Sequence, residues 1–195
     1  MSSAPDRGVL EALAALIRAL GEAEAPAMII GGIAVIARGV PRLTVDIDAT
    51  AWGEAVSLET LFSTLEAHEI VPRIPQAEDF ARSRQILLLE HRPTGTPLDI
   101  SLAWLPFERE ALRRASPVDF GGVTIPVAQA EDLLVYKAVA WRDRDKEDVE
   151  RLLLLHAEEI DLDRVRDLIR QFAEALDEPK RIEEFDALVR RTLGA

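Results

Sequence analysis

Three features of the sequence have residue types and spacing suited to phosphate chemistry. They are a double glycine after a short apolar run, an Asp-x-Asp pair, and a single aspartate inside an aliphatic run: Gly31-Gly32, Asp46 with Asp48, and Asp99. Residues i and i+2 of a β-strand point to the same side, so the pair would share one face, which a third carboxylate can join from a neighbouring strand. Oxygen ligands suit Mg²⁺, and two such ions about 3.5–4 Å apart can activate an attacking oxygen and stabilise a leaving phosphate. The three features together predict a magnesium site.

The double glycine has its own part in this prediction. Gly31-Gly32 falls where a short buried strand is expected to turn into a helix. Backbone N–H groups at such a junction can hold an anionic phosphate, because glycine permits close approach and the helix dipole favours negative charge. Singly, each feature has a simpler interpretation, since polar residues alternate outward on a half-covered sheet and glycines commonly form turns. Their combination favours the phosphate-binding metal site.

The same residues resemble a known family. One set of residues resembles the signature of the DNA polymerase β-type nucleotidyltransferases. It consists of Ile30-Gly31-Gly32, then, after thirteen residues, Asp46-Ile47-Asp48-Ala49, and downstream Leu98-Asp99-Ile100. A longer set resembles the minimal nucleotidyltransferases of the abortive-infection (type IV) toxin type: Gly31-Gly32-Ile33-Ala34, the run from Arg42 through Thr44 to Asp48, and Glu131-Asp132 to Tyr136-Lys137 with Arg142, Asp145 and Asp148. The resemblance covers about residues 26 to 155.

The resemblance implies a role for each residue of the predicted site. Gly31 and Gly32 would bind the triphosphate of a nucleoside triphosphate, and Asp46 and Asp48 would hold two Mg²⁺ ions. Asp99 would ligate one ion and serve as the base. Many members of the family have serine at the second glycine position, where its hydroxyl touches phosphate, whereas Gly32 offers only its backbone.

Four more residues are candidates for nucleotide binding. The resemblance implies that Lys137 contacts phosphate. Arg42 and Thr44 are expected on the same strand face as Asp46, which makes them candidates for phosphate or acceptor contact, although chance placement explains them as well. Lys137 and Arg142 are five residues apart, or about 140° around a helix, so they need not face one cleft. The alternating charges around Arg142 are also typical of a solvated, salt-bridged helix.

The activity implied by this family is transfer of a nucleoside monophosphate from a nucleoside triphosphate to an acceptor hydroxyl, with release of pyrophosphate. The acceptor stays open between tRNA, a partner protein and a small hydroxylated molecule such as an antibiotic. The resemblance also implies that the protein could act in a toxin–antitoxin or phage-defence system, together with a cognate toxin or antitoxin partner. The alternative is a catalytically silent binding module that keeps the nucleotidyltransferase fold and acts through a partner protein.

Hydrophobic periodicity indicates the elements that would position these residues. Apolar spacing of three and four predicts helices, and short β-branched or aliphatic runs predict strands. The expected helices are 6–20 (ended by Gly21), 33–38, 58–68, 107–115, 128–144, 149–156, 165–176 and 182–193, and the expected strands are 26–30, 43–52, 85–91, 98–104 and a two-stranded segment at 118–125. This order predicts an α/β (α+β) fold with a mixed, largely antiparallel sheet and flanking helices. We expect a nucleotidyltransferase core at 1–128 and a helical region at 129–195.

Composition limits the remaining possibilities. The 195 residues carry a formal net charge of −12 and no cysteine, which excludes disulfides, thiolate metal sites and cysteine nucleophiles. The charge has the wrong sign for a protein that coats nucleic acid, so tRNA would need a focused basic surface from Arg38, Arg42, Arg82 and Arg84. Residues 1–8 do not resemble a secretory signal, and the uncharged run at 25–37 is too short to cross a bilayer. We therefore expect a cytoplasmic protein without a membrane partner.

Overall fold

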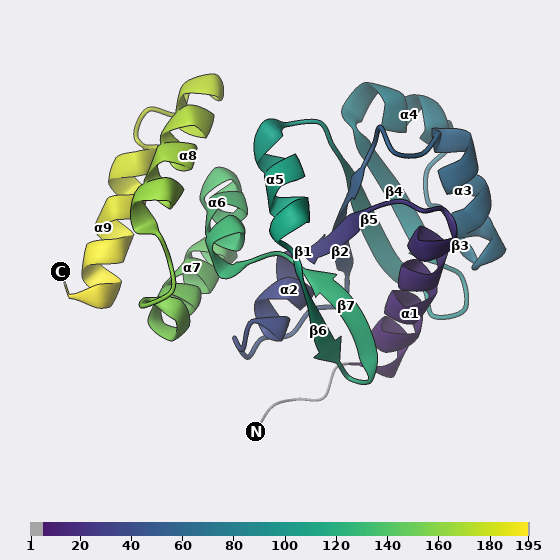
Figure 1. The fold of residues 1–195 in the computed structure, drawn as a ribbon, viewed down its shortest axis with the longest axis horizontal. Helices are drawn as coiled ribbons and strands as arrows, with labels where there is room; N and C mark the ends of the chain where they lie inside the picture. Colours follow the sequence, from purple (N-terminus) through teal and green to yellow (C-terminus); the bar gives the residue numbers. More distant parts are fainter. Residues whose placement is uncertain (1–5, 195) are drawn as a thin grey trace. The chain divides into compact units, whose positions relative to one another are not determined.

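The computed structural model describes residues 6–194. Contacts divide the chain into two units, each with its own core. The sheet unit comprises Met1–Ala37 and Pro41–Ala128, and the helical unit comprises Arg38–Val40 and Gln129–Ala195. Figure 1 traces both units along the chain.

One mixed sheet forms the centre of the sheet unit. Its seven strands lie in the order β3-β4-β5-β2-β1-β7-β6. Their bounds are β1 Ala27–Ile30, β2 Ile47–Trp52, β3 Ile70–Pro72, β4 Ile86–His91, β5 Thr96–Ala103, β6 Ser116–Phe120 and β7 Val123–Val127. The pairs β1–β7 and β2–β5 are parallel, and the other neighbouring pairs are antiparallel. The expected mixed, largely antiparallel sheet is confirmed, and β4 and β5 form a hairpin.

The helices of the sheet unit are α1 Arg7–Glu22, α2 Gly31–Ala37, α3 Leu58–Ala67, α4 Ala77–Arg84 and α5 Pro106–Arg114. The stripe of α1 that contains Leu13 and Leu16 is fully buried, and each such leucine stabilises the fold by about 1.5–3 kcal/mol. Gly21 does not end this helix, contrary to the sequence expectation, since one glycine costs only about 1 kcal/mol. The helix ends before Glu24, which adopts a left-handed conformation with φ 50°.

Strand β5 shows how the sheet separates its core from its polar face. Leu98, Ile100 and Leu102 are buried, and α1 packs against β5. Asp99 lies between them in sequence and therefore projects from the opposite face. The alternation places an aspartate on the accessible side of a strand whose other side belongs to the core.

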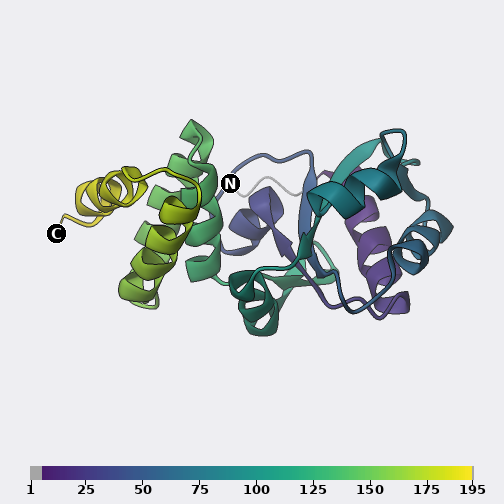
Figure 2. The same ribbon diagram turned by 90° about the horizontal axis from the view of Figure 1, so that it is seen from above.

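The helical unit is built from α6 Ala130–Ala140, α7 Asp143–His156, α8 Leu162–Ala175 and α9 Arg181–Leu193. Figure 2 shows α9 crossing the direction of α8. The helix expected at 128–144 stops at Ala140 because Trp141 takes a left-handed conformation with φ 50°, and α7 then begins six residues before the expected start at 149. Within residues 6–194, no helix combines the length and apolar character needed to span a membrane.

Candidate nucleotide-binding and metal-binding site

The strand-to-helix turn at Gly31 is fitted to Asp48. β1 ends at Ile30, which pairs with Asp48 in β2, and α2 starts at the next residue. Gly31 has φ +61°, and a Cβ on it would overlap the carboxylate of Asp48. Glycine is required here for both the left-handed backbone and the close approach. The expected double glycine at a strand-to-helix junction is confirmed.

Asp48 and Asp99 are neighbours across the sheet. The parallel pairing of β2 and β5 sets Asp48 directly beside Asp99. Paired residues of adjacent strands project from the same face, so both carboxylates lie on one side of the sheet. Each residue is half-buried. Register alone brings these two sequence-predicted acidic residues together.

Asp46 is positioned by a loop and not by the strand. β2 begins only at Ile47, so the expectation that Arg42, Thr44 and Asp46 share a strand face is wrong. β1 turns into α2 after Ile30 and leaves no strand to pair with residues 43–46. The hydroxyl of Thr44 donates a hydrogen bond of 2.6 Å to Asp46 Oδ1, which fixes this carboxylate locally.

The loop that carries Thr44 packs on Gly32. A Cβ on Gly32 would lie 2.9 Å from Cβ of Thr44 and 3.2 Å from Nη2 of Arg42, and still nearer the Thr44 hydroxyl. Distances under about 3.0 Å are not found around real Cβ atoms. The glycine at this position is therefore required by contact with Thr44 and Arg42, and serine would displace the loop.

Arg73 forms an ion pair with Asp99 that the sequence did not reveal. Its Nη2 lies 2.7 Å from Asp99 Oδ1. Oδ1 is buried, and the pair lacks the geometry of a hydrogen bond. Arg73 directly follows β3, a strand missing from the sequence expectation, so no pattern linked it to Asp99.

The three aspartates do not form a three-carboxylate cluster. Among residues 6–194, no group of three or more histidine or acidic side chains is arranged to hold a metal ion. The expected convergence of Asp46, Asp48 and Asp99 is therefore not formed; Asp46 accepts a hydrogen bond from Thr44, and Asp99 pairs with Arg73. Their donor chemistry still fits Mg²⁺, since Asp48 and Asp99 share a face and Asp99 Oδ1 is a buried oxygen without a hydrogen bond. The metal roles of the three remain predictions.

Lys137 and Arg142 belong to the helical unit. Lys137 is buried, with Nζ 3.0 Å from Asp145 Oδ1 and 2.8 Å from Asp148 Oδ2. The side chain of Arg142 is 80% exposed and pairs with Asp145 Oδ2 at 3.2 Å. This geometry gives both cations carboxylate partners, so a phosphate contact by Lys137 would require a buried pair to open.

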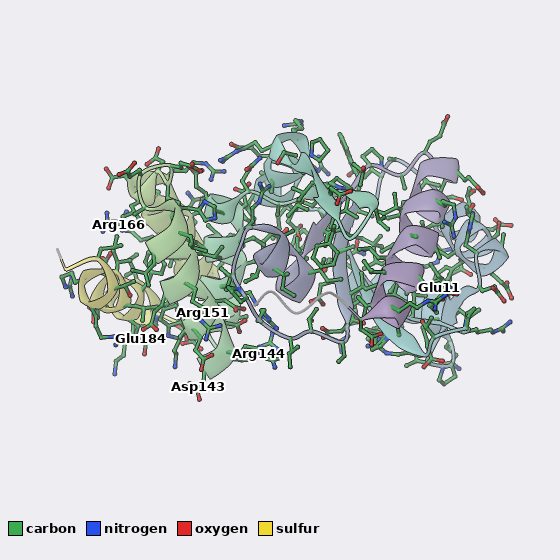
Figure 3. All side chains as sticks on the ribbon, turned by 90° about the horizontal axis from the view of Figure 1, so that it is seen from below. Glu11, Asp143, Arg144, Arg151, Arg166 and Glu184 are labelled. Atoms are coloured by element: carbon green, nitrogen blue, oxygen red, sulfur yellow. The ribbon has the colours of Figure 1, made fainter. Side chains whose placement is uncertain are left out.

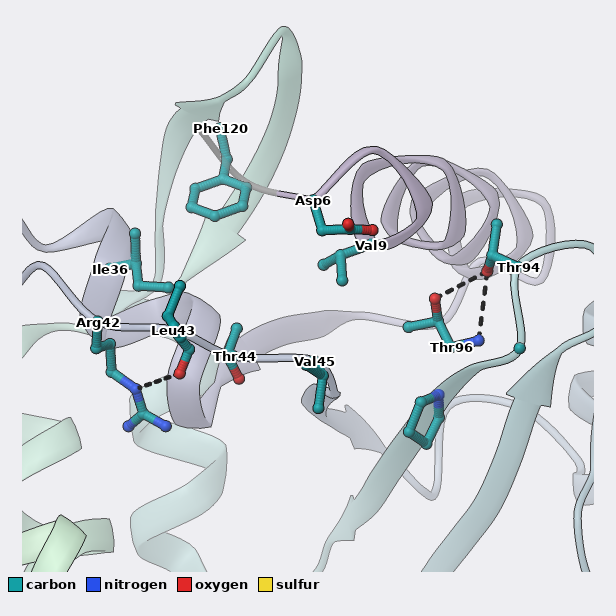
Figure 4. A pocket seen from close by; sticks show the side chains of 12 residues that line it. Asp6, Val9, Ile36, Arg42, Leu43, Thr44, Val45, Thr94, Thr96 and Phe120 are labelled. Atoms are coloured by element: carbon teal, nitrogen blue, oxygen red, sulfur yellow. Dashed lines mark hydrogen bonds between the residues drawn. The ribbon is translucent and has the colours of Figure 1, made fainter. Parts of the chain in front are cut away.

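A cavity of about 710 Å³ lies in the sheet unit. Its lining includes Asp6, Val9, Arg42 and Phe120 together with the β4–β5 turn, and Figure 4 shows the loop from Arg42 to Val45 along one side. Leu43 and Val45 are about three-quarters exposed. The loop thus borders both the carboxylate site, through Thr44, and this cavity.

The sequence matches the family described as nucleotidyltransferase of unknown function (DUF6036) over residues 8–191. The chain belongs to this nucleotidyltransferase family. The match spans both units of the structure and agrees with the family resemblance found in the sequence. A search among curated proteins finds no match for this nucleotidyltransferase.

Solved structures share the fold of this nucleotidyltransferase. The antibiotic-resistance factor ANT(2'')-Ia, in solution, is 22% identical with a TM-score of 0.63, covering 88% of this chain and 96% of its own. A crystal structure of ANT(2'')-Ia with adenylyl-2''-tobramycin is 19% identical with a TM-score of 0.58, covering 87% and 98%. JHP933 from Helicobacter pylori is 16% identical with a TM-score of 0.51, covering 96% and 82%. At these identities the likeness shows the fold.

Proposed function

We propose that this protein is a Mg²⁺-dependent nucleotidyltransferase that moves a nucleoside monophosphate from a nucleoside triphosphate to an acceptor hydroxyl. The observation that carries the proposal is the Gly31 turn packed against Asp48, with Asp99 beside Asp48 on the next strand. Two carboxylates on one face and a glycine turn next to them supply oxygen ligands and backbone donors at one place. Family membership supports the same reaction class.

The residues would divide the reaction as follows. The acceptor oxygen forms a bond to the α-phosphorus, the bond from that phosphorus to the bridging oxygen breaks, and pyrophosphate leaves. Asp99 takes the proton of the acceptor hydroxyl, while Gly31 and Gly32 hold the triphosphate through backbone N–H groups. Asp46 and Asp48 would hold Mg²⁺, which supplies charge neutralisation when bound. Thr44 would orient Asp46 through its hydroxyl.

A hydroxylated, cationic small molecule is the acceptor class that we favour. A net charge of −12 attracts cations and repels polyanions. One solved structure of the same fold contains an adenylylated small molecule, adenylyl-2''-tobramycin. tRNA or a partner protein as acceptor, including a toxin–antitoxin partner, is tested by offering each in turn with α-labelled nucleotides.

Replacement of the aspartates tests the proposal. Asp46→Asn and Asp48→Asn should abolish label transfer, because each removes a metal ligand. Asp99→Asn should lower the rate by roughly 10²-fold or more while nucleotide affinity, measured by calorimetry with Mg²⁺, stays within a few-fold. Asp119→Asn, on the exposed edge strand β6, is the control and should change neither quantity. Unchanged labelling in Asp46→Asn and Asp48→Asn would refute the assignment.

A binding module without turnover is the second candidate. The Arg73–Asp99 ion pair favours this candidate, because Arg73 occupies the carboxylate of the proposed base. This candidate predicts a stable complex with a partner protein and no labelling of any acceptor, with the three Asn variants leaving that complex intact.

A further inference from the structure

Arg73 is anchored at two points before it reaches Asp99. Its backbone N–H donates to the carbonyl of Leu88 at 3.1 Å, and its Nη1 donates to the carbonyl of Leu89 at 3.2 Å. Both carbonyls belong to β4, and Leu88 is the register partner of Asp99 in the neighbouring β5. The guanidinium therefore crosses β4 and presents Nη2 to the carboxylate from a fixed direction.

The Asp99 carboxylate, which pairs with Arg73, also has a negatively charged neighbour. Asp48 lies directly beside Asp99 across the β2–β5 pair. Like charges on neighbouring strands destabilise a sheet unless a cation offsets them. Arg73 supplies that cation at Oδ1 of Asp99, on the face where the proposed metal would bind.

We propose that Arg73 is a positioning residue that acts through Asp99 as an internal counter-ion, occupying Oδ1 until a divalent cation displaces it. This inference rests on the proposed function, since it assumes that Asp99 is a metal ligand. Arg73 and the metal compete for one oxygen, so the ion pair occupies the Asp99 oxygen that a shared metal ion would need. That competition agrees with the lack of a three-carboxylate cluster among residues 6–194.

The competition predicts that metal binding improves when Arg73 is removed. At a given distance, a unit positive charge repels a divalent cation about twice as strongly as it repels another unit charge. Removing the Arg73 charge should therefore raise the affinity for the divalent cation by on the order of 10-fold. A residue with only a structural role would give the opposite result, because a loosened site binds its metal more weakly.

The experiment measures binding of Mn²⁺ alone, by calorimetry and by electron paramagnetic resonance. Arg73→Gln should bind Mn²⁺ about 10-fold more tightly than the wild type. Arg73→Lys, which keeps the charge, should change affinity by less than about 3-fold. Half-saturating Mg²⁺ for label transfer should fall in Arg73→Gln, while the rate at saturating Mg²⁺ stays within a few-fold.

Two further variants make the result specific. Arg109→Gln is the matched control, since Arg109 has a similar side-chain exposure of 32% against 31% and pairs with Glu54 at 2.8 Å. It should leave Mn²⁺ affinity unchanged. In an Asp99→Asn background, Arg73→Gln should no longer tighten binding, because the shared oxygen has lost its charge.

The outcomes separate this inference from the proposed function. Equal or weaker Mn²⁺ binding by folded Arg73→Gln, with an active wild type, overturns the role of Arg73 and leaves the transferase intact. If Arg73→Gln does not fold, Arg73→Lys decides: Mn²⁺ binding about 10-fold tighter, although the charge is kept, overturns the role of Arg73, and binding within about 3-fold of the wild type supports it. Failure of the wild type to bind Mn²⁺ or transfer label overturns both.

Discussion

Asp48 and Asp99 are placed by register, whereas Asp46 is placed by a single hydrogen bond. The strand pairing that sets Asp48 beside Asp99 is continuous from Ile47 to Trp52, so displacing either aspartate would require the pairing to shift and move core residues out of the sheet. Asp46 lies before the strand and depends on Thr44. At the scale of single residues, the site therefore combines a rigid pair with one adjustable carboxylate.

Gly32 gives a stability test of the loop contact. We expect Gly32→Ala to destabilise the protein by about 1–3 kcal/mol, because the new methyl group overlaps Thr44. In a Thr44→Gly background the same change should be neutral or stabilising, since alanine is the better helix former. The free energy of unfolding in urea measures the coupling as a double-mutant cycle.

Gly21 is the matched control for this cycle. It lies inside α1, and nothing stands within 4 Å of a Cβ added to it. Gly21→Ala should stabilise the protein by up to about 1 kcal/mol. Equal effects of Gly32→Ala with and without Thr44 would show that the loop yields freely and that Gly32 is not required by this contact.

At the scale of elements, the sequence predicts that a strand or helix exists better than it predicts the residues at which that element begins and ends. The strands at 26–30 and 85–91 and the helix at 58–68 were recognisable from apolar patterns that packing confirms. β3 has three residues and was missed because so short a strand has no period of its own. α4, also missed, has one buried residue, Ala81, and its pattern is mainly polar. The start of β2 depends on where β1 leaves the sheet, which is tertiary information.

The α6–α7 pair shows why a residue role is harder to predict than an element. The sequence favoured a phosphate contact for Lys137, and nothing local indicated that the chain would break at Trp141. That break brings α7 back against α6 and places Asp145 and Asp148 at the ammonium group. The partner of a buried charge is decided by packing that the sequence pattern does not contain.

Removal of Lys137 should therefore lower stability. Lys137→Met leaves two buried carboxylates without their shared cation, and we expect a loss of about 3–5 kcal/mol in the free energy of unfolding. Arg142→Gln, whose side chain is 80% exposed, should cost less than about 1 kcal/mol. Unchanged stability of Lys137→Met with lost nucleotide affinity would instead support the phosphate contact.

The β4–β5 hairpin should respond to acid through His91. His91 is 3% exposed, its Nδ1 lies 2.9 Å from Thr94 Oγ1, and burial lowers its pKa below the ordinary value. Below pH about 6.5 the unfolded chain takes up the proton first, so the free energy of unfolding falls until the pH passes the folded pKa. His91→Asn keeps a partner for Thr94 and does not titrate.

Urea unfolding at pH 7.5 and 5.5 measures this contribution. Both proteins carry the same other acidic and basic groups, so the difference between their pH responses isolates His91. The wild type should lose more stability between the two pH values than His91→Asn. An identical loss in both proteins would contradict a burial-driven pKa shift at His91.

At the scale of the whole molecule, the net charge bears on which acceptors the proposed transferase would use. Charges of both signs stand on α7, as Figure 3 shows for Asp143, Arg144 and Arg151. Two of the four arginines that tRNA would need have other contacts: Arg82 pairs with Glu78, and Arg42 lines the cavity. The net charge of −12 opposes the approach of a polyanion.

We therefore expect tRNA to bind weakly and cationic acceptors to be favoured at low salt. Filter binding with total tRNA should show no saturation below about 10 μM protein at 150 mM salt, because non-specific binding is electrostatic and needs phosphate contacts. The KM for a polycationic aminoglycoside should rise with salt as screening weakens its attraction to the acidic surface. A neutral hydroxylated sugar, used as the control acceptor, should show little salt dependence. Tight tRNA binding that weakens steeply between 50 and 200 mM salt would require a basic groove and would make RNA the acceptor.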